Sequence, residues 1–185
     1  MNTTPEAAQR VLRTADCLHS ELAVQAAYDR LAEAIAREYE GRNPLLLCVM
    51  IGGLHATAEI SRRLAFPLEI DYLHATRYRG ATQGGGLVWK KQPDATRIES
   101  RHVLVIDDIL DEGHTMVAIR DALRGFSPAS LKVAVLTEKL HDRRAPGAHA
   151  EFIGLQVEDR YVFGCGMDYK EYWRQLPAIY AVKDL

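Results

Sequence analysis

Hydrophobic runs of strand length alternate with stretches of helical period along the chain. The apolar runs lie at residues 45–50, 102–106 and 131–137, and residues 68–74 alternate with one polar face. Helical patterns occupy residues 5–14, 20–41, 54–64 and 117–126. Continuous apolar strands separated by helices are typical of a parallel sheet covered on both faces. The pattern predicts an α/β fold whose central, mostly parallel sheet is flanked by helices, in a single domain over residues 1–185.

The longest predicted helix carries no candidate chemistry. Ser20 suits its N-cap and Gly41 its end, because serine accepts from free N–H groups and glycine tolerates the left-handed conformation. We expect this helix to be scaffold. Its apolar stripe is predicted at Leu22, Ala26, Leu31, Ile35 and Tyr39.

Residues 101–116 contain the strongest chemical signal. A buried strand runs directly into Asp107 and Asp108, and ligands of parallel sheets bind beyond such strand ends. Ionised carboxylates accept hydrogen bonds from vicinal hydroxyls or bind a hydrated divalent cation. Residues 111–115 then open a helix, whose free N–H groups favour a phosphate. The alternative interpretation is an ordinary helix cap beside solvated acids.

The string Val-Leu-Val-Ile-Asp-Asp-Ile-Leu-Asp-Glu-Gly-His-Thr at residues 103–115 resembles the phosphoribosyl-pyrophosphate signature of the type I phosphoribosyltransferases. Its form is similar to that of the purine-salvage branch. The family commonly has Glu-Asp at Asp107-Asp108, and Thr or Ser at Glu112. The resemblance covers about residues 45–182 and implies a small hood made by the N-terminal and C-terminal segments.

The resemblance also implies an activity. Members of this branch transfer 5-phosphoribosyl from phosphoribosyl pyrophosphate to N9 of hypoxanthine or guanine, giving IMP or GMP and pyrophosphate, with Mg²⁺ and as homodimers or homotetramers. Asp107 and Asp108 would bind the ribose, and Asp111 would act as the general base. The predicted 5′-phosphate site consists of Asp111, Glu112, Gly113, His114 and Thr115.

A glycine pair follows the strand at residues 45–50. Alone it indicates only a tight turn. By resemblance it is the pyrophosphate loop, with Ile51 and Gly52 as contacts and a cis peptide between Met50 and Ile51. The family's lysine is replaced by Ile51, so backbone N–H groups, magnesium or another basic side chain must attract the pyrophosphate.

Residues 75–86 are rich in glycine and polar side chains, and an extended pattern resumes at residues 87–90. This combination predicts a hairpin whose tip is either a simple surface loop or a lid. The family has a flexible catalytic loop here, to which Thr76-Arg77-Tyr78 is similar. The resemblance therefore implies that Arg77 and Tyr78 belong to the catalytic machinery.

The remaining candidates lie in the last third of the chain. Lys139 stands at the end of a predicted strand, where a lysine is often just solvated. By resemblance, the purine contacts are Lys139, Tyr161, Val162 and Asp168, Arg174 binds pyrophosphate, and Asp168 joins Asp107 and Asp108 at the metal. An ammonium donates but does not accept hydrogen bonds, so Lys139 would favour a 6-oxopurine over adenine.

Composition narrows the partners and the compartment. A net charge of −2 and a pI near 6.4 disfavour nucleic acid and anionic membranes as partners. No apolar run approaches the roughly 20 residues that span a bilayer. Three widely spaced cysteines, Cys17, Cys48 and Cys165, suit a reducing cytoplasm.

Two alternatives to oxopurine salvage remain open at this point. One is an enzyme of the same fold that acts on xanthine or another base. The other is a nucleotide-sensing regulator with little catalysis. A response-regulator receiver also carries a strand-end acid pair, but it needs neither the phosphate turn at residues 113–115 nor the aromatic tail at residues 159–177.

Overall fold

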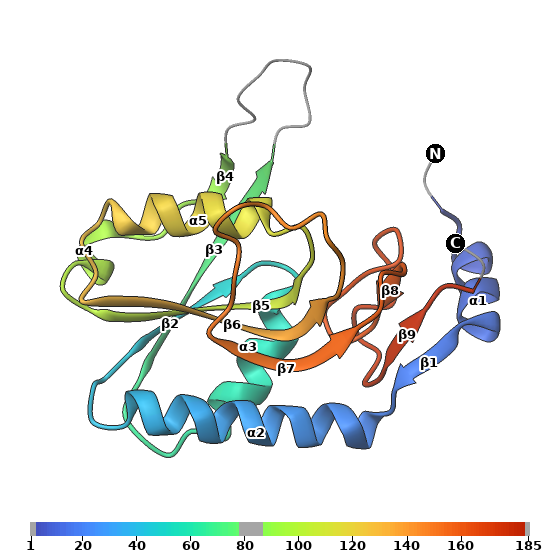
Figure 1. Cartoon of the computed structure of the whole chain (residues 1–185), viewed down its shortest axis with the longest axis horizontal. Coiled ribbons are helices and arrows are strands. Elements are labelled where there is room, and N and C mark those ends of the chain that lie inside the picture. Colours follow the sequence, from blue (N-terminus) through green and yellow to red (C-terminus); the bar gives the residue numbers. More distant parts are fainter. Residues whose placement is uncertain (1–2, 78–86, 184–185) are drawn as a thin grey trace.

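Two β-sheets organise the chain, a large one at its centre and a small one built from its two ends (Figure 1). The computed structural model describes residues 3–77 and 87–183. In the large sheet all neighbouring strands are parallel except β3 and β4, which form an antiparallel hairpin. The strand order is β4 (Leu87–Lys91), β3 (Glu69–Arg77), β2 (Leu45–Val49), β5 (His102–Leu110), β6 (Ser130–Lys139) and β7 (Phe152–Val157). The predicted central, mostly parallel sheet is confirmed.

Helices cover both faces of the large sheet. Along β5, Val103 and Val105 point into one hydrophobic cluster, and Leu104 and Ile106 into the other, because successive side chains of a strand alternate between faces. Helices α2 (Glu21–Tyr39) and α3 (Gly53–Ser61) pack on the Leu104 face. Helices α4 (Ala95–Ile98) and α5 (His114–Arg124) pack on the opposite face (Figure 1).

The predicted stripe of α2 was only partly right. Ser20 caps the helix as expected, and Leu31, Ile35 and Tyr39 are buried. Leu22, however, is 83% exposed, and Ala26 is also exposed. Nine residues are about two and a half helical turns, so Leu22 points away from the side that carries Leu31. The buried positions nearer the N-terminus are Val24, Ala27 and Tyr28.

Two strands continue further than their sequence patterns predicted. Strand β5 stays paired with β6 as far as Leu110, so Asp107 and Asp108 lie within the strand rather than in a loop. Strand β3 extends through Arg77, which pairs with Leu87 of β4. In both places, ladder hydrogen bonds to a neighbour sustain the strand where side-chain polarity suggests a loop.

The small sheet joins the ends of the chain and forms the hood. Its order is β1 (Asp16–His19), β9 (Ile179–Ala181) and β8 (Val162–Phe163), and helix α1 (Pro5–Thr14) precedes it. Phe163 and Val182 centre its own hydrophobic cluster, and Trp173 Nε1 donates to the Ala8 carbonyl at 3.0 Å. Figure 1 shows the hood next to the carboxyl ends of β6 and β7.

Within residues 3–77 and 87–183, none of the helices combines the length and the apolarity that crossing a bilayer requires.

The α2 packing gives a stability prediction. Ile35 is 0% exposed, so Ile35→Ala should lower the free energy of unfolding by about 2–5 kcal/mol through lost burial and a residual cavity. Leu22→Ala on the same helix is the matched control and should change it by less than about 0.5 kcal/mol. Urea unfolding followed by circular dichroism measures both. Equal losses in the two variants would contradict the packing described.

Candidate active site

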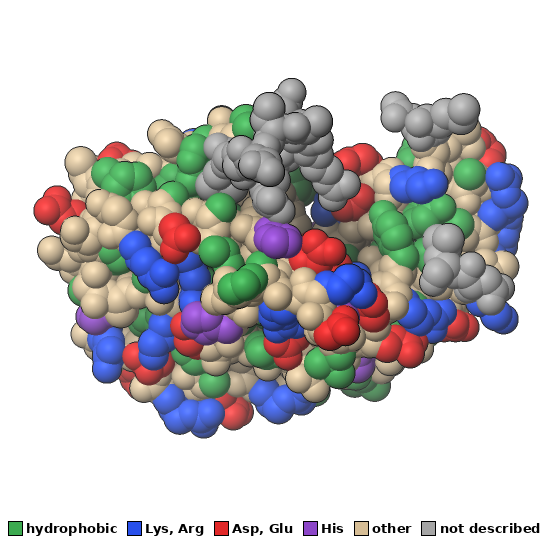
Figure 2. Space-filling view, turned by 45° about the horizontal axis from the view of Figure 1, so that its top comes forward, with side chains coloured by type: hydrophobic (Ala, Val, Ile, Leu, Met, Phe, Trp, Pro, Cys, Tyr) green, Lys and Arg blue, Asp and Glu red, His purple; other side chains and the backbone are tan. Residues whose placement is uncertain are grey.

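A cavity of about 1070 Å³ opens where the carboxyl ends of the large sheet face the hood. Figure 2 shows a hollow between the body of the molecule and the hood, with acidic side chains at its edge. Most of the residues singled out from the sequence line it. They are Gly52, Asp107, Asp108, Asp111, Glu112, Gly113, His114, Thr115, Lys139, Tyr161, Val162, Asp168 and Arg174.

Among the described residues predicted for the site, Ile51 is not one of those that line the cavity. Ile51 is 48% exposed, and its neighbours Met50 and Gly52 line the cavity instead. The peptide bond between Met50 and Ile51 is cis, as the resemblance implied. Arg77 ends β3, but its side chain lies outside the described part of the structure. Tyr78 also lies outside the described residues.

The acid pair, Asp107 and Asp108, lies near the carboxyl end of β5, and Asp108 is two residues before the strand ends at Leu110. Asp107 Oδ1 accepts the Asp108 N–H at 2.9 Å, and Asp108 Oδ1 accepts the Ile109 N–H at 2.7 Å. Burial, together with the neighbouring Asp108 charge, raises the pKa of Asp107 well above its ordinary value. Burial also raises the pKa of Asp108. Two adjacent carboxylates that resist ionisation favour a partner that brings positive charge or hydroxyl donors.

Two glycines pack directly against the acid pair. A Cβ on Gly52 would lie 2.3 Å from Asp108 Oδ2, and a Cβ on Gly166 would lie 2.2 Å from the Gly52 carbonyl oxygen. Any larger residue at either position would therefore push these loops apart. The close approach brings the ends of β2 and β5 and the hood together around one point.

The turn before α5 has the geometry of an anion site. Gly113 caps the helix with φ +80°, a conformation that favours glycine. The first backbone N–H groups of α5 lack partners within the helix, and Thr115 adds a hydroxyl beside the cavity. The Glu112 side chain is 53% exposed and approaches basic groups, with its oxygens 3.7 Å from His114 Nε2 and 3.9 Å from Arg143 Nε. Glu112 also lines the cavity, where the nearby Arg143 guanidinium offsets part of its negative charge.

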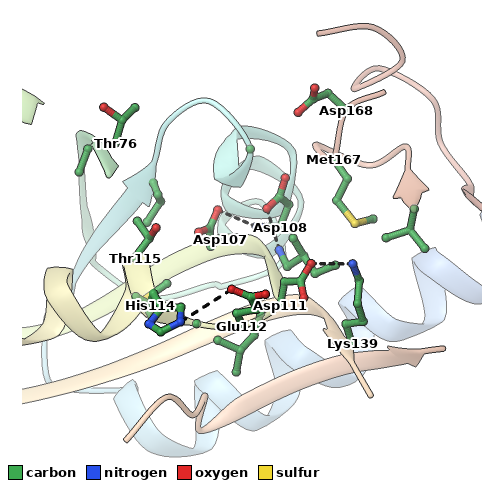
Figure 3. A pocket seen from close by; sticks show the side chains of 18 of the residues that line it. Thr76, Asp107, Asp108, Asp111, Glu112, His114, Thr115, Lys139, Met167 and Asp168 are labelled. Carbon is green, nitrogen blue, oxygen red and sulfur yellow. Dashed lines mark hydrogen bonds and ion pairs between the residues drawn. The ribbon is translucent and has the colours of Figure 1, made fainter. Parts of the chain in front are cut away.

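Asp111 is bound by two basic side chains at once. Lys139 Nζ lies 2.6 Å from Asp111 Oδ2, and His141 Nε2 lies 2.8 Å from Asp111 Oδ1. Figure 3 shows the Lys139 contact at the cavity wall. Partial burial raises the pKa of Asp111, but the hydrogen bonds from both partners and the positive charge of Lys139 outweigh it, and the pKa lies below its ordinary value. Sequence reasoning missed His141, because nothing local connects it to a residue 30 positions earlier.

The hood supplies the opposite wall. Tyr161 is 40% exposed, and its ring meets that of Tyr169 edge to face at 5.5 Å. Arg174 binds Asp168 Oδ1 through Nη2 at 2.6 Å and the Gly166 carbonyl through Nη1 at 2.8 Å. Figure 3 shows Asp168 across the cavity from Lys139 and the acid pair. Further lining residues that the sequence analysis did not assign are Val49, Met50, Ala75, Thr76, Ile109, Leu110, Met116 and Met167.

A parallel sheet with an acid pair and a phosphate turn at its strand ends defines a protein that binds a phosphorylated sugar or nucleotide. Comparison with known proteins narrows this class. The family described as phosphoribosyl transferase domain matches residues 14–171. The chain therefore belongs to the phosphoribosyltransferase family.

Curated relatives cover most of the chain. A hypoxanthine-guanine-xanthine phosphoribosyltransferase of Tritrichomonas foetus is 35% identical over 167 residues, which are 90% of this chain and 91% of that protein. A hypoxanthine-guanine phosphoribosyltransferase of Streptococcus pneumoniae is 32% identical over 84% of this chain and 86% of its own length. These similarities extend across both the sheet and the hood.

Solved structures share the fold. A hypoxanthine-guanine phosphoribosyltransferase of Bacillus anthracis superposes with a TM-score of 0.82 at 30% identity, covering 91% of this chain and 97% of that chain. A hypoxanthine phosphoribosyltransferase of Staphylococcus aureus gives a TM-score of 0.84 at 28% identity, with 91% of each chain covered. The predicted type I phosphoribosyltransferase fold is confirmed.

The buried acid pair predicts a stability gain on neutralisation. Asp107→Asn keeps the acceptor for the Asp108 N–H and removes a charge that burial disfavours. At neutral pH it should raise the free energy of unfolding of the unliganded protein by about 1–3 kcal/mol.

The pH dependence of this gain follows from the raised pKa of Asp107. Below about pH 4 the wild-type carboxyl is protonated in both the folded and the unfolded state, so the two proteins should differ little. The gain should grow as pH rises through the raised pKa. Thermal unfolding at several pH values measures it, and Asp121→Asn, at an exposed site on α5, is the control. A gain that shrinks as pH rises would contradict the assignment.

Proposed function

We propose that the protein is a purine-salvage enzyme. It transfers the 5-phosphoribosyl group of phosphoribosyl pyrophosphate to N9 of hypoxanthine or guanine and releases pyrophosphate. The observation that carries this proposal is the single cavity in which an acid pair, a phosphate turn and Lys139 converge. The names of the Tritrichomonas and Streptococcus relatives support the choice of base.

Each part of the sugar substrate has a matching group in the cavity. Asp107 and Asp108 accept hydrogen bonds from the ribose hydroxyls. The turn from Asp111 to Thr115 binds the 5′-phosphate through the backbone N–H groups of Glu112, Gly113, His114 and Thr115. For pyrophosphate we propose the backbone of Gly52, which lines the cavity, and of the adjacent Ile51, whose side chain is exposed outside it. Arg174 reaches the pyrophosphate by exchanging its contact with Asp168.

The purine lies between Lys139 and the hood. Lys139 leaves Asp111 and donates to the exocyclic oxygen O6, while the exposed ring of Tyr161 stacks on the base. Stacking of a base on an aromatic ring contributes about 1–3 kcal/mol. The backbone of Val162 reads the edge of the purine, and Asp168 completes this part of the pocket. A lysine that only donates disfavours the 6-amino group of adenine.

The donor set fits Mg²⁺ as the cofactor. The oxygens of Asp107, Asp108 and Asp168 face the cavity, and the first two lie where burial disfavours uncompensated negative charge. In the described part of the chain, no group of three His, Cys, Asp or Glu side chains could hold a metal by itself. Mg²⁺ usually takes one or two carboxylates together with substrate phosphates, which matches this arrangement. Mg²⁺ held by these carboxylates and the substrate would offset the negative charge of the pyrophosphate leaving group.

Asp111 is the proposed general base at the purine ring. Its carboxylate stands at the cavity wall beside Lys139, and departure of Lys139 to the base frees Oδ2 to accept a purine proton. Positive charge develops on the ribose as pyrophosphate leaves, and water must be kept from it. Arg77 and Tyr78 are the proposed residues for this protection, by resemblance of their loop to the family's catalytic loop.

We also propose a homodimer or homotetramer in the cytoplasm. The outer face of β3 exposes Ile70 and Tyr72, and Leu54 near the start of α3 is exposed as well, which suits burial against a second copy. The three cysteines are free, which suits a reducing compartment. The proposed partners are the purine base and phosphoribosyl pyrophosphate, without nucleic acid or membrane.

The proposal predicts turnover with 6-oxopurines. Pyrophosphate release should be measured with phosphoribosyl pyrophosphate and Mg²⁺, offering hypoxanthine, guanine, xanthine and adenine separately. We expect turnover with hypoxanthine and guanine and a kcat/KM for adenine roughly 10⁴-fold lower, because adenine leaves the Lys139 ammonium without an acceptor.

Reactions without any base provide the background rate. Turnover with xanthine as well would broaden the substrate range without changing the reaction. If no base gives pyrophosphate release above background, in protein that still binds IMP or GMP, the enzymatic proposal is overturned in favour of a nucleotide-sensing regulator.

A further inference from the structure

His141 is a buried side chain that the proposed chemistry does not yet use. It follows β6 by two residues, its side chain is 2% exposed, and its Nε2 contacts the carboxylate of Asp111. We propose that His141 is a positioning residue that fixes the Asp111 carboxylate for proton transfer at the purine. This inference rests on the proposed role of Asp111 as the general base.

Hydrogen bonding determines which nitrogen of His141 carries the proton. The backbone N–H of Arg143 donates to His141 Nδ1 at 3.1 Å. A backbone N–H can only donate, so Nδ1 must be the acceptor and the neutral ring carries its hydrogen on Nε2. Nε2 therefore donates to Asp111 Oδ1, at 2.8 Å. The ring needs no positive charge to make this bond.

The two partners of Asp111 occupy different surroundings. Lys139 lines the cavity, where a substrate can draw it away, whereas His141 is buried and is not among the lining residues. When Lys139 moves to the purine, Oδ2 loses its partner but Oδ1 keeps the bond from His141. The carboxylate then stays in one orientation, with its free oxygen toward the base. Such fixed orientation lowers the entropic cost of reaching the reactive geometry.

The segment that carries His141 is itself held at two points. Arg143 pairs with both carboxylate oxygens of Asp159, with Nη1 at 2.6 Å and Nη2 at 2.9 Å. Arg144 donates to the Lys139 carbonyl at 2.7 Å and pairs with Glu138. These bonds tie residues 141–144 to the end of β6 and to the segment that leads into the hood. His141 is therefore placed by a fixed frame.

Two substitutions separate a positioning role from a structural one. In His141→Gln the amide nitrogen can occupy the place of Nε2 and donate to Asp111, but the acceptor for Arg143 is lost. In His141→Asn the amide oxygen can occupy the place of Nδ1 and accept from Arg143, but nothing reaches Asp111. We expect kcat to fall about tenfold in His141→Asn, the loss of one hydrogen bond to a charged group. His141→Gln should stay within about threefold of wild type.

The KM for phosphoribosyl pyrophosphate should be unchanged in both variants, because the proposed phosphate contacts are backbone N–H groups of residues 112–115 and His141 contacts Asp111 only at its side chain. In an Asp111→Asn background, His141→Asn should lower kcat no further, since the two residues act through one contact. Equal kcat losses in the Gln and Asn variants would overturn the inference. A tenfold loss of kcat when His141→Asn is added to Asp111→Asn would also overturn it.

A spectroscopic readout tests the geometry without turnover. The ¹⁵N shifts of the His141 imidazole at about pH 7.5 should show hydrogen on Nε2 and none on Nδ1. Hydrogen on Nδ1 would overturn the inference even in an active enzyme. A different result is wild-type protein that shows the Nε2–H form of His141 but releases no pyrophosphate with any base. That result would overturn the proposed function and the positioning role that depends on it.

Discussion

Two adjacent carboxylates near the end of the central strand, the half-buried Asp107 and the buried Asp108, are the constraint around which the site is built. Strand β5 is buried along most of its length, and its pairing with β6 carries Asp107 and Asp108 to the edge of the sheet without leaving the ladder. Burial there raises the pKa of both groups. Because ionising them in place is unfavourable, a ligand with hydroxyl donors or a divalent cation recovers free energy that the unliganded fold lacks.

The neighbouring loops are shaped by the same pair. Gly52 can approach Asp108 only because it has no side chain, and Gly166 approaches Gly52 for the same reason. These contacts bring the hood to the sheet edge, and Arg174 then bonds the Gly166 carbonyl and Asp168. The proposed ribose, pyrophosphate and purine contacts are thus parts of one packing arrangement.

Much of this arrangement could be predicted from local sequence. The apolar run before Asp107 and the glycine at 113 are local signals of a buried strand and of a helix start. Lys139 alone indicated only a solvated residue at a strand end, and its role in the site came from the resemblance. The resemblance then added the tail, including Tyr161 and Arg174. The structure places the predicted site residues that it describes around the cavity, with the exception of Ile51. The Arg77 side chain and Tyr78 lie outside the described residues.

The sequence predictions that were wrong or incomplete share one physical cause. Each concerns a feature that depends on contacts with residues far away in the sequence. The length of β5 is decided by pairing with β6, and the exposure of Leu22 by which side of α2 meets the sheet. His141 acquires its contact with Asp111 only when the end of β6 lies beside the end of β5. No periodicity or spacing within one segment contains that information.

Proton exchange on ligand binding tests the role of the acid pair most directly. Calorimetric titration of the protein with phosphoribosyl pyrophosphate and Mg²⁺, in buffers of different ionisation enthalpy, counts the protons released. As the pH is raised from about 4, we predict net proton release from wild type wherever the unliganded pair is still protonated, and a clearly smaller release from Asp107→Asn, because ligand binding favours the ionised pair. Identical proton release from the two proteins would contradict the assignment of Asp107 and Asp108 as the ribose and metal site.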